Sequence, residues 1–242
     1  MIPLLFITLT ALFSYSSLVP TIEPVKAALV AKGFIPAACP ENTIFAFDMH
    51  KVFMKQNFWQ LTKSLAKTYH FSVLKFLTPS SFKRWHKVGE VAFSDLEKQH
   101  PKLKGISRHF EEFMLNQPFM LDTVDIIKGL KHKGYKIYVL SNCAQETYEK
   151  LQIKFPAIFT LFDGEYLPNN KNNYHHKPQL SFYKGFKSYV AQKGHNLKQI
   201  IFIDDKKENI VAAREENILG IQFENAKKLH TDIQKLEYGL LV

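Results

Sequence analysis

Residues that could do chemistry follow short apolar runs in this sequence. They are Asp48 after IFAF, Ser141 after YVL, Asp204 and Asp205 after IIFI, and Lys177 in the polar loop HHKPQLSFY. Open α/β sheets bind ligands at the carboxyl ends of their strands. We therefore expect these side chains to converge on one crevice.

Such a set suits phosphoryl transfer assisted by a divalent cation. Three carboxylates close together would raise each other's pKa, and Mg²⁺ relieves this because it prefers oxygen ligands. A lysine neutralises further charge and can orient a carboxylate, and a serine hydroxyl can donate to a phosphoryl oxygen. A carboxylate nucleophile that forms an aspartyl-phosphate divides one hard displacement into two easier ones, while metal and lysine offset the charge on the phosphoryl group.

The elements that must position these residues alternate along the chain. Helices are expected over 122–134, 145–154, 180–192 and 208–217, and strands over 44–47, 135–140, 158–162, 199–203 and 218–223. Alternation of this kind predicts the α/β class, with a Rossmann-like parallel sheet and helices on both faces. From about Gln56 to Asn116 the pattern is helical only, which suggests an all-helical insert.

The first 40 residues read as a leader and linker interrupted by prolines. Met1–Phe13 is strongly apolar, and Val25–Ala27 offers a small-residue cleavage pattern. If residues 1–27 act as a signal, the protein is exported or membrane-attached; otherwise it is cytoplasmic. The alternative is an apolar strand or helix that packs on the domain.

Composition indicates a folded domain, and its basic charge fits either an anionic partner or an organism whose proteins are generally basic. The 242 residues are 46% hydrophobic and 22% charged, with a formal net charge of +10. A basic surface attracts phosphorylated substrates, but no compact arginine run with aromatics indicates specific nucleic-acid binding. Membrane contact is expected only through the N-terminal segment. Cys39 and Cys143 form no C-x-x-C motif.

Four segments together resemble the haloacid dehalogenase-like (HAD) hydrolase superfamily. They are FAFDMHKVF for the first motif, YVLSN for the second, the Lys-Pro of HHKPQLSFY for the third, and IIFIDDKKENIVAAREENILGIQF for the fourth. The match runs in order from about residue 44 to 224, excluding the helical insert. Four motifs in order are far more specific than any one of them.

The resemblance implies a HAD-like core over 41–55 and 119–242, with a small helical cap over 56–118. It also implies the following site. Asp48 would be the nucleophile and a Mg²⁺ ligand, and His50 would bind Mg²⁺ through its backbone carbonyl. Ser141 and the backbone of Asn142 would hold the phosphoryl group, and Lys177 would bridge the nucleophile and the acidic pair. Asp205 would be the direct metal ligand, with Asp204 at the metal or just behind it. The expected function is a Mg²⁺-dependent phosphatase acting on a small phosphorylated metabolite.

His50 departs from the family pattern, which places an acid/base Asp two residues after the nucleophile. Histidine has a suitable unperturbed pKa for that work. His50 could therefore be the acid/base, mark a leaving group that needs little protonation, or mark a weak or inactive member. Lys51 also replaces the small glycine usual at its position.

Other interpretations remain for the same residues. Asp48 could be a turn residue, Ser141 and Asn142 or the acidic pair could cap helices, and Lys177 could be a solvated loop residue. His175 and His176 are expected to be loop residues without metal, and Cys143 a packed thiol. At the level of function, the alternatives are a non-catalytic binding protein and a metal-independent dehalogenase-type hydrolase.

Overall fold

A computed structural model of the chain describes residues 37–56, 63, 112–195 and 198–240. The chain divides into two compact units. Cys39–Ile233 holds the sheet and all the candidate site residues. The second unit combines Met1–Ala38 with Gln234–Val242, and within it the backbone N–H of Ala38 donates to the carbonyl oxygen of Leu236 at 2.9 Å.

The core of the larger unit is a five-stranded parallel sheet in the order β3-β2-β1-β4-β5. Its strands are β1 (Thr43–Phe47), β2 (Lys136–Leu140), β3 (Gly164–Tyr166), β4 (Gln199–Asp204) and β5 (Leu219–Gln222). All five residues of β1 are buried, as expected for the central strand of a sheet covered on both faces.

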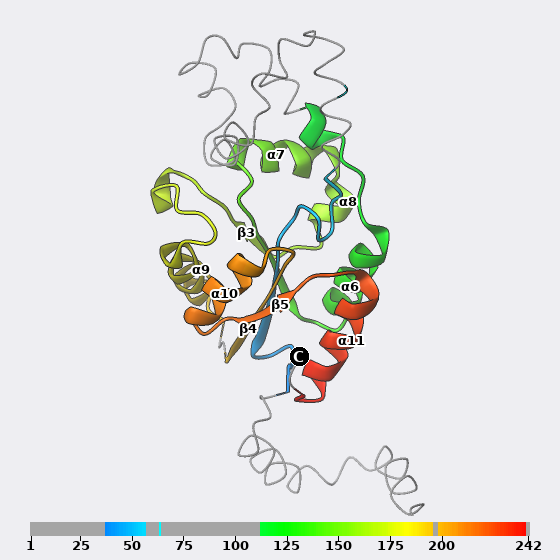
Figure 1. The fold of residues 1–242 in the computed structure, drawn as a ribbon, viewed down its shortest axis with the longest axis vertical. Helices are drawn as coiled ribbons and strands as arrows, with labels where there is room; N and C mark the ends of the chain where they lie inside the picture. The colour runs from blue at the N-terminus through cyan, green and yellow to red at the C-terminus, as the bar shows by residue number, and fades with distance from the viewer. Residues whose placement is uncertain (1–36, 57–62, 64–111, 196–197, 241–242) are drawn as a thin grey trace, which may run out of the picture. The chain divides into compact units, whose positions relative to one another are not determined.

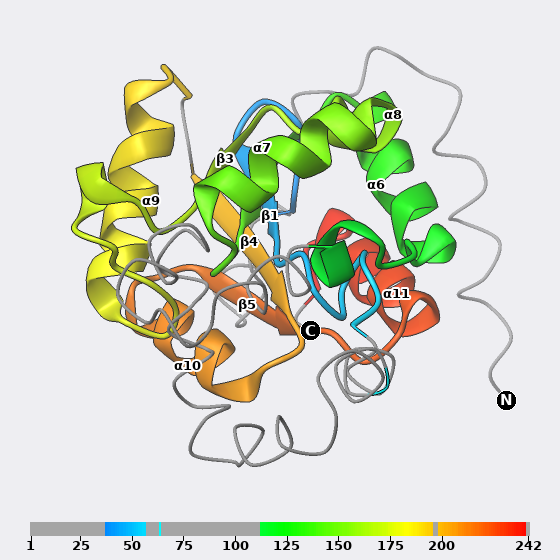
Figure 2. The same cartoon turned by 90° about the horizontal axis from the view of Figure 1, so that it is seen from above.

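Helices cover the two faces of the sheet (Figures 1 and 2). The helices of the described residues are α6 (Leu121–His132), α7 (Gln145–Lys154), α8 (Pro156–Phe159), α9 (Leu180–Gln192), α10 (Lys207–Glu215) and α11 (Ala226–Glu237), with the short 3-10 helix η6 (Asn170–Asn172). Helices α9 and α10 lie on one face of the sheet and α6 on the other (Figure 2). One face packs Ile44, Tyr138 and Phe202 against Phe186 of α9 and Ile210 of α10. On the other face, α6 buries Val124, Ile127 and Leu130.

The expected α/β architecture is therefore confirmed, but two parts of it differ from expectation. Residues 158–162 are not a strand: they lie in α8 and the turn after it, and β3 begins only at Gly164. Pro156 at the first helical position favours a helix there, and Phe159 is buried within it. Helix α11 was not expected at all.

The cap predicted over 56–118 lies almost wholly outside the described residues, as does the leader predicted over 1–40. Only residues 56, 63 and 112–118 of the first segment, and 37–40 of the second, are described. Within the described part of the chain, no helix combines the length and apolar character that a membrane crossing needs.

Candidate active site at the carboxyl edge of the sheet

The three central strands end in the polar residues that the sequence singled out. Asp48 directly follows β1, and its backbone N–H donates to the carbonyl oxygen of Ile203 at 2.8 Å. Ser141 directly follows β2 and is buried. Asp204 is the last residue of β4, and Asp205 comes next. Because these strands are parallel neighbours, their carboxyl ends bring the four side chains to one edge of the sheet.

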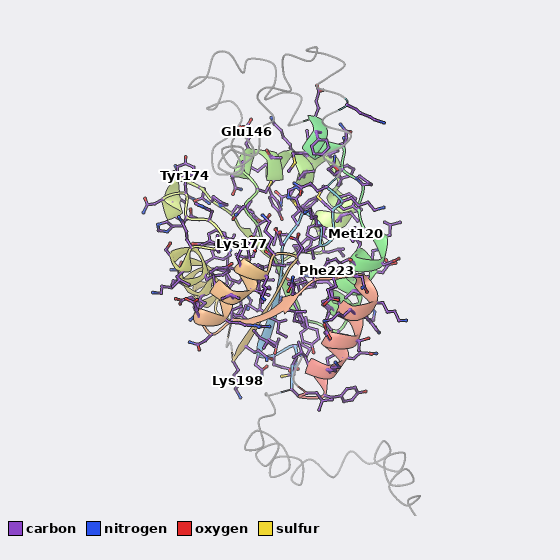
Figure 3. The ribbon with its side chains drawn as sticks, viewed as in Figure 1. Met120, Glu146, Tyr174, Lys177, Lys198 and Phe223 are labelled. Atoms are coloured by element: carbon purple, nitrogen blue, oxygen red, sulfur yellow. The ribbon has the colours of Figure 1, made fainter. Side chains whose placement is uncertain are left out.

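Lys177 reaches this edge from the loop between β3 and α9, and Figure 3 marks its place. Its Nζ lies 2.9 Å from Oδ1 of Asp48 and 2.6 Å from Oδ2 of Asp204. The lysine side chain is only 1% exposed, and its Nζ also lies over the ring of Phe202, 5.1 Å from the centroid. Lys177 is thus a buried bridge between two carboxylates, not a solvated loop lysine.

Asp204 uses both carboxylate oxygens in hydrogen bonds within the protein. Its Oδ1 accepts from the backbone N–H of Lys206 at 2.8 Å and from Nδ2 of Asn209 at 3.0 Å. Its Oδ2 accepts from the same Asn209 nitrogen at 2.9 Å as well as from Lys177. Asp204 is fully buried, so its carboxylate is fixed as an anchor for Lys177. Sequence reasoning missed Asn209, although it follows Glu208 in the fourth motif.

Asn142 joins the end of β2 to the loop that carries Lys177. Its Nδ2 donates to the carbonyl oxygen of Lys177 at 2.9 Å, and its Oδ1 accepts from the Lys177 backbone N–H at 2.8 Å. The expectation for Asn142 concerned its backbone alone. Its side chain therefore has a positioning task that the sequence did not predict.

Electrostatics keep Asp48 and Lys177 charged. Burial by itself would raise the pKa of Asp48, but the charges of Lys177 and His50, with hydrogen bonds from Lys177 and Ser141, lower that pKa below its usual value. Burial would lower the pKa of Lys177, but the charges of Asp204 and Asp48 raise it. Asp48 is consequently an ionised carboxylate, the state that a nucleophile needs.

The acidic pair experiences the opposite shift. Burial, followed by the charge of Asp48, raises the pKa of Asp204 to about 6, although Lys177 opposes the change. Burial and then the charge of Asp48 also raise the pKa of Asp205. Two carboxylates with raised pKa values beside a third, ionised one form a site that gains from a bound cation.

Carboxylate oxygens of Asp48, Asp204 and Asp205 all lie within 4.8 Å of one another. Hard oxygen donors at this spacing fit Mg²⁺ or a similar cation. Among the described residues this is the one group of three or more acidic, His or Cys side chains so arranged. His175 and His176 are not part of it.

The residues after Asp48 form a tight loop. His50 is half-buried and pairs in an isolated bridge with Met54. Lys51 adopts a left-handed backbone with φ of 60°, its N–H donates to the Met54 carbonyl oxygen at 2.6 Å, and its Nζ lies 3.8 Å from Oδ2 of Asp205. Nearby, burial followed by the charge of Asp48 raises the pKa of Cys143, which agrees with a packed thiol.

Comparison with solved structures identifies the fold. A predicted HAD-like family hydrolase from Porphyromonas gingivalis superposes with a TM-score of 0.61 at 17% identity, covering 81% of this chain and 98% of its own. A HAD family enzyme from Bacteroides thetaiotaomicron, in complex with magnesium and inorganic phosphate, superposes with a TM-score of 0.59 at 15% identity, covering 76% of this chain and 94% of its own. L-2-haloacid dehalogenase from Xanthobacter autotrophicus superposes with a TM-score of 0.53 at 10% identity, covering 80% of this chain and 83% of its own.

Sequence comparison is more limited. No family model matches the chain. A sesquiterpene phosphatase from Aspergillus oryzae is 26% identical over 111 residues, which are 46% of this chain and 54% of the relative. The chain thus spans about half the length of that curated relative. The structural likenesses show that the chain has the HAD-like fold, as its four motifs suggested.

Proposed function

We propose that this chain, which has the HAD-like fold, is a Mg²⁺-dependent hydrolase, most specifically a phosphatase that works through an aspartyl-phosphate on Asp48. The observation that carries the proposal is the buried Lys177 bridge, with Nζ at 2.9 Å from Asp48 and 2.6 Å from Asp204. This bridge supports the proposal because it stabilises the ionised form of Asp48 next to two further acidic groups.

In this mechanism a carboxylate oxygen of Asp48 attacks the phosphorus atom of the substrate. A bond forms between that oxygen and phosphorus, and the ester P–O bond breaks. Lys177 offsets the charge beside the reacting carboxylate, and the Ser141 hydroxyl donates to a phosphoryl oxygen. Water then attacks the aspartyl-phosphate, which releases inorganic phosphate and restores Asp48.

The residues that would hold a divalent cation are Asp48 and Asp205, through their carboxylates, and His50, through its carbonyl oxygen. Asp204 would not bind the cation directly but would position Lys177 beside it, because the Asp204 oxygens already accept four hydrogen-bond contacts from Lys177, Lys206 and Asn209. When bound, the cation offsets charge on the transferring phosphoryl group.

His50 is the proposed acid and base. Its ring would donate a proton to the leaving alkoxide and then accept one from the attacking water. Its charge already acts on Asp48, because it contributes to the lowered pKa of that carboxyl. A His50→Ala variant should lose activity by about a hundredfold or more on alkyl esters, and less on an aryl phosphate whose leaving group needs little protonation.

Two sources suggest the substrates to test. The net charge of +10 favours the binding of anionic substrates. The relative that matches 46% of this chain is a sesquiterpene phosphatase. A panel should therefore hold small sugar and alkyl monophosphates together with prenyl phosphates, with an aryl phosphate as the generic probe.

The test is an Asp48→Asn variant, which removes the nucleophile but keeps its shape. We expect hydrolysis to fall to background, and acid-quenched wild-type protein to carry a phosphoryl adduct on the peptide with Asp48. Asp125→Asn is the matched control, because Asp125 is an exposed partner of Lys128. Full activity in Asp48→Asn would refute the aspartyl mechanism.

A non-catalytic binding protein is the second candidate, favoured by His50 in the acid/base position. Its signature would be retained binding of Mg²⁺ and phosphate with no turnover across the panel. A metal-independent dehalogenase does not need the acidic pair beside Asp48, and halide release from a 2-haloacid without Mg²⁺ would be required to favour it.

A further inference from the structure

Lys51 holds a backbone conformation that is unfavourable for its residue type. Its φ of 60° lies in the left-handed region, which glycine adopts freely and residues with a Cβ adopt at a cost. A strained residue at the edge of a site raises the question of what its side chain does there.

The ammonium of Lys51 lies at the acidic cluster. Its Nζ is 3.8 Å from Oδ2 of Asp205, and the two side chains are 52% and 20% exposed. Lys177 forms ion pairs with the other two carboxylates of the cluster. Its side chain is 1% exposed and is fixed between Asp48 and Asp204. The ion pairs that the described residues make with this cluster thus involve a buried lysine held from two sides and an exposed lysine on a long, flexible side chain, while the charge of Lys206 also acts on Asp205.

We propose that Lys51 is a displaceable counter-ion that competes with the divalent cation for Asp205. This rests on the proposed function, in which Asp205 binds that cation. Without the cation, Lys51 offsets the charge of Asp205. When the cation binds, the ammonium leaves Asp205 and remains at the exposed side of the site, where it adds a positive charge for the incoming phosphate.

Two charge-removing variants test the competition, and one control accompanies them. Lys51→Gln shortens and neutralises the side chain, and Lys51→Gly also relieves the left-handed backbone. Lys55→Gln makes the same charge change four residues along the same loop, where Lys55 is exposed and forms no ion pair with Asp48, Asp204 or Asp205. Affinity for Mg²⁺ is measured by calorimetry, and for Mn²⁺ by electron paramagnetic resonance, on the full chain without substrate.

Both Lys51 variants should bind the cations about two- to fivefold more tightly than wild type, the range for a partly exposed ion pair. Lys51→Arg and Lys55→Gln should match wild type. At saturating Mg²⁺, inorganic phosphate should bind Lys51→Gln a few-fold more weakly than wild type, because a nearby exposed charge is lost.

The proposal requires both changes. Unchanged cation affinity in Lys51→Gln and Lys51→Gly, or unchanged phosphate affinity, would overturn it. An equal gain in cation affinity in Lys55→Gln would also overturn it, because the gain would then come from the lower net charge of the protein and not from the position of Lys51. A wild-type protein that binds neither Mg²⁺ nor Mn²⁺ would instead refute the proposed function, so the two failures are distinguishable.

Discussion

Asn142 fixes Lys177 through the backbone of that lysine. Replacing Asn142 by alanine removes both hydrogen bonds to the Lys177 peptide groups. We expect kcat to fall about tenfold to a hundredfold, because a small displacement of a positioned group is costly. The binding of phosphate with Mg²⁺ should change much less, and steady-state kinetics with calorimetry will separate the two.

Asn225→Ala is the matched control for this change. Its Oδ1 accepts from the backbone N–H of Lys228 at the start of α11, so its loss should lower the melting temperature slightly and leave kcat unchanged. If Asn142→Ala keeps the wild-type kcat, then the Asn142 side chain does not position Lys177 for the reaction.

The strand-end residues could be predicted, but their partners could not. Asp48, Ser141 and the acidic pair follow apolar runs, so the rule for parallel sheets locates them. The Asn142 side chain acts across segments 35 residues apart, whose relative placement only the fold determines. Asn209 lies five residues after Asp204 in the same motif, but the turn into α10 that brings the two side chains together shows no sign in the residue types. The left-handed backbone of Lys51 could be inferred only from the glycine that is usual at its position, because a lysine itself carries no sign of it.

At the scale of elements, the packing of α10 on β5 depends on the absence of one side chain. A Cβ on Gly220 would lie 2.7 Å from Cγ2 of Ile210 and 3.2 Å from its backbone oxygen. Gly220→Ala should therefore lower the free energy of unfolding by about 1–3 kcal/mol, as overpacked sites do. Denaturant titration would measure the change.

Gly129 offers the opposite case within α6. A Cβ there meets nothing within 4 Å, and alanine favours a helix more than glycine does. Gly129→Ala should raise the free energy of unfolding by up to about 1 kcal/mol. A Gly220→Ala variant as stable as Gly129→Ala would contradict the close approach of α10 to β5.

Asp163 ties α6 to the start of β2. Its Oδ2 accepts from Lys131 Nζ at 2.7 Å and from the backbone N–H of Ile137 at 3.0 Å. Burial would raise the pKa of Asp163, but these hydrogen bonds and the charge of Lys131 lower it below 3.8. A lowered folded-state pKa gives stability that is present above the unfolded pKa and lost as the pH falls.

Asp163→Asn should accordingly destabilise the protein by about 1 kcal/mol at neutral pH, since solvent screens part of the ion pair. The difference from wild type should shrink as the pH falls below 3.8 and vanish below the lowered folded-state pKa, because the carboxyl is protonated first in the unfolded chain and only then in the folded protein. Unfolding titrations at several pH values test this, and a difference independent of pH would exclude a role for the charge.

Element boundaries were predictable where the local signals agreed with the packing. Helices α7 and α9 have the expected ends. Strand β3 was missed because Gly164, Glu165 and Tyr166 form only three residues with a weak strand signal, and its place comes from pairing with β2. The run at 158–162 reads as a strand locally, but Pro156 and the burial of Phe159 favour a helix.

At the scale of the whole molecule, a bound cation should stabilise the fold by mass action. At a Mg²⁺ concentration about a hundred times the dissociation constant, the gain is about 2.7 kcal/mol. That corresponds to an increase of about 5–10 °C in the melting temperature for a protein of this size. A chelator should reverse the increase.

Asp205→Asn should abolish most of this thermal shift, whereas the exposed Asp125→Asn should keep it. Differential scanning calorimetry provides the comparison. An Asp205→Asn protein with the full shift would place the cation somewhere other than the acidic cluster.

The central place of β1 has a consequence for biosynthesis. β1 pairs with β2 on one side and with β4, which begins at Gln199, on the other. Until a ribosome has released β4, the nascent chain carries a strand of five apolar or β-branched residues with one edge unpaired, and such an edge invites pairing with other chains. Products truncated before Gln199 should therefore aggregate, and the growing polypeptide should depend on chaperones until late in translation.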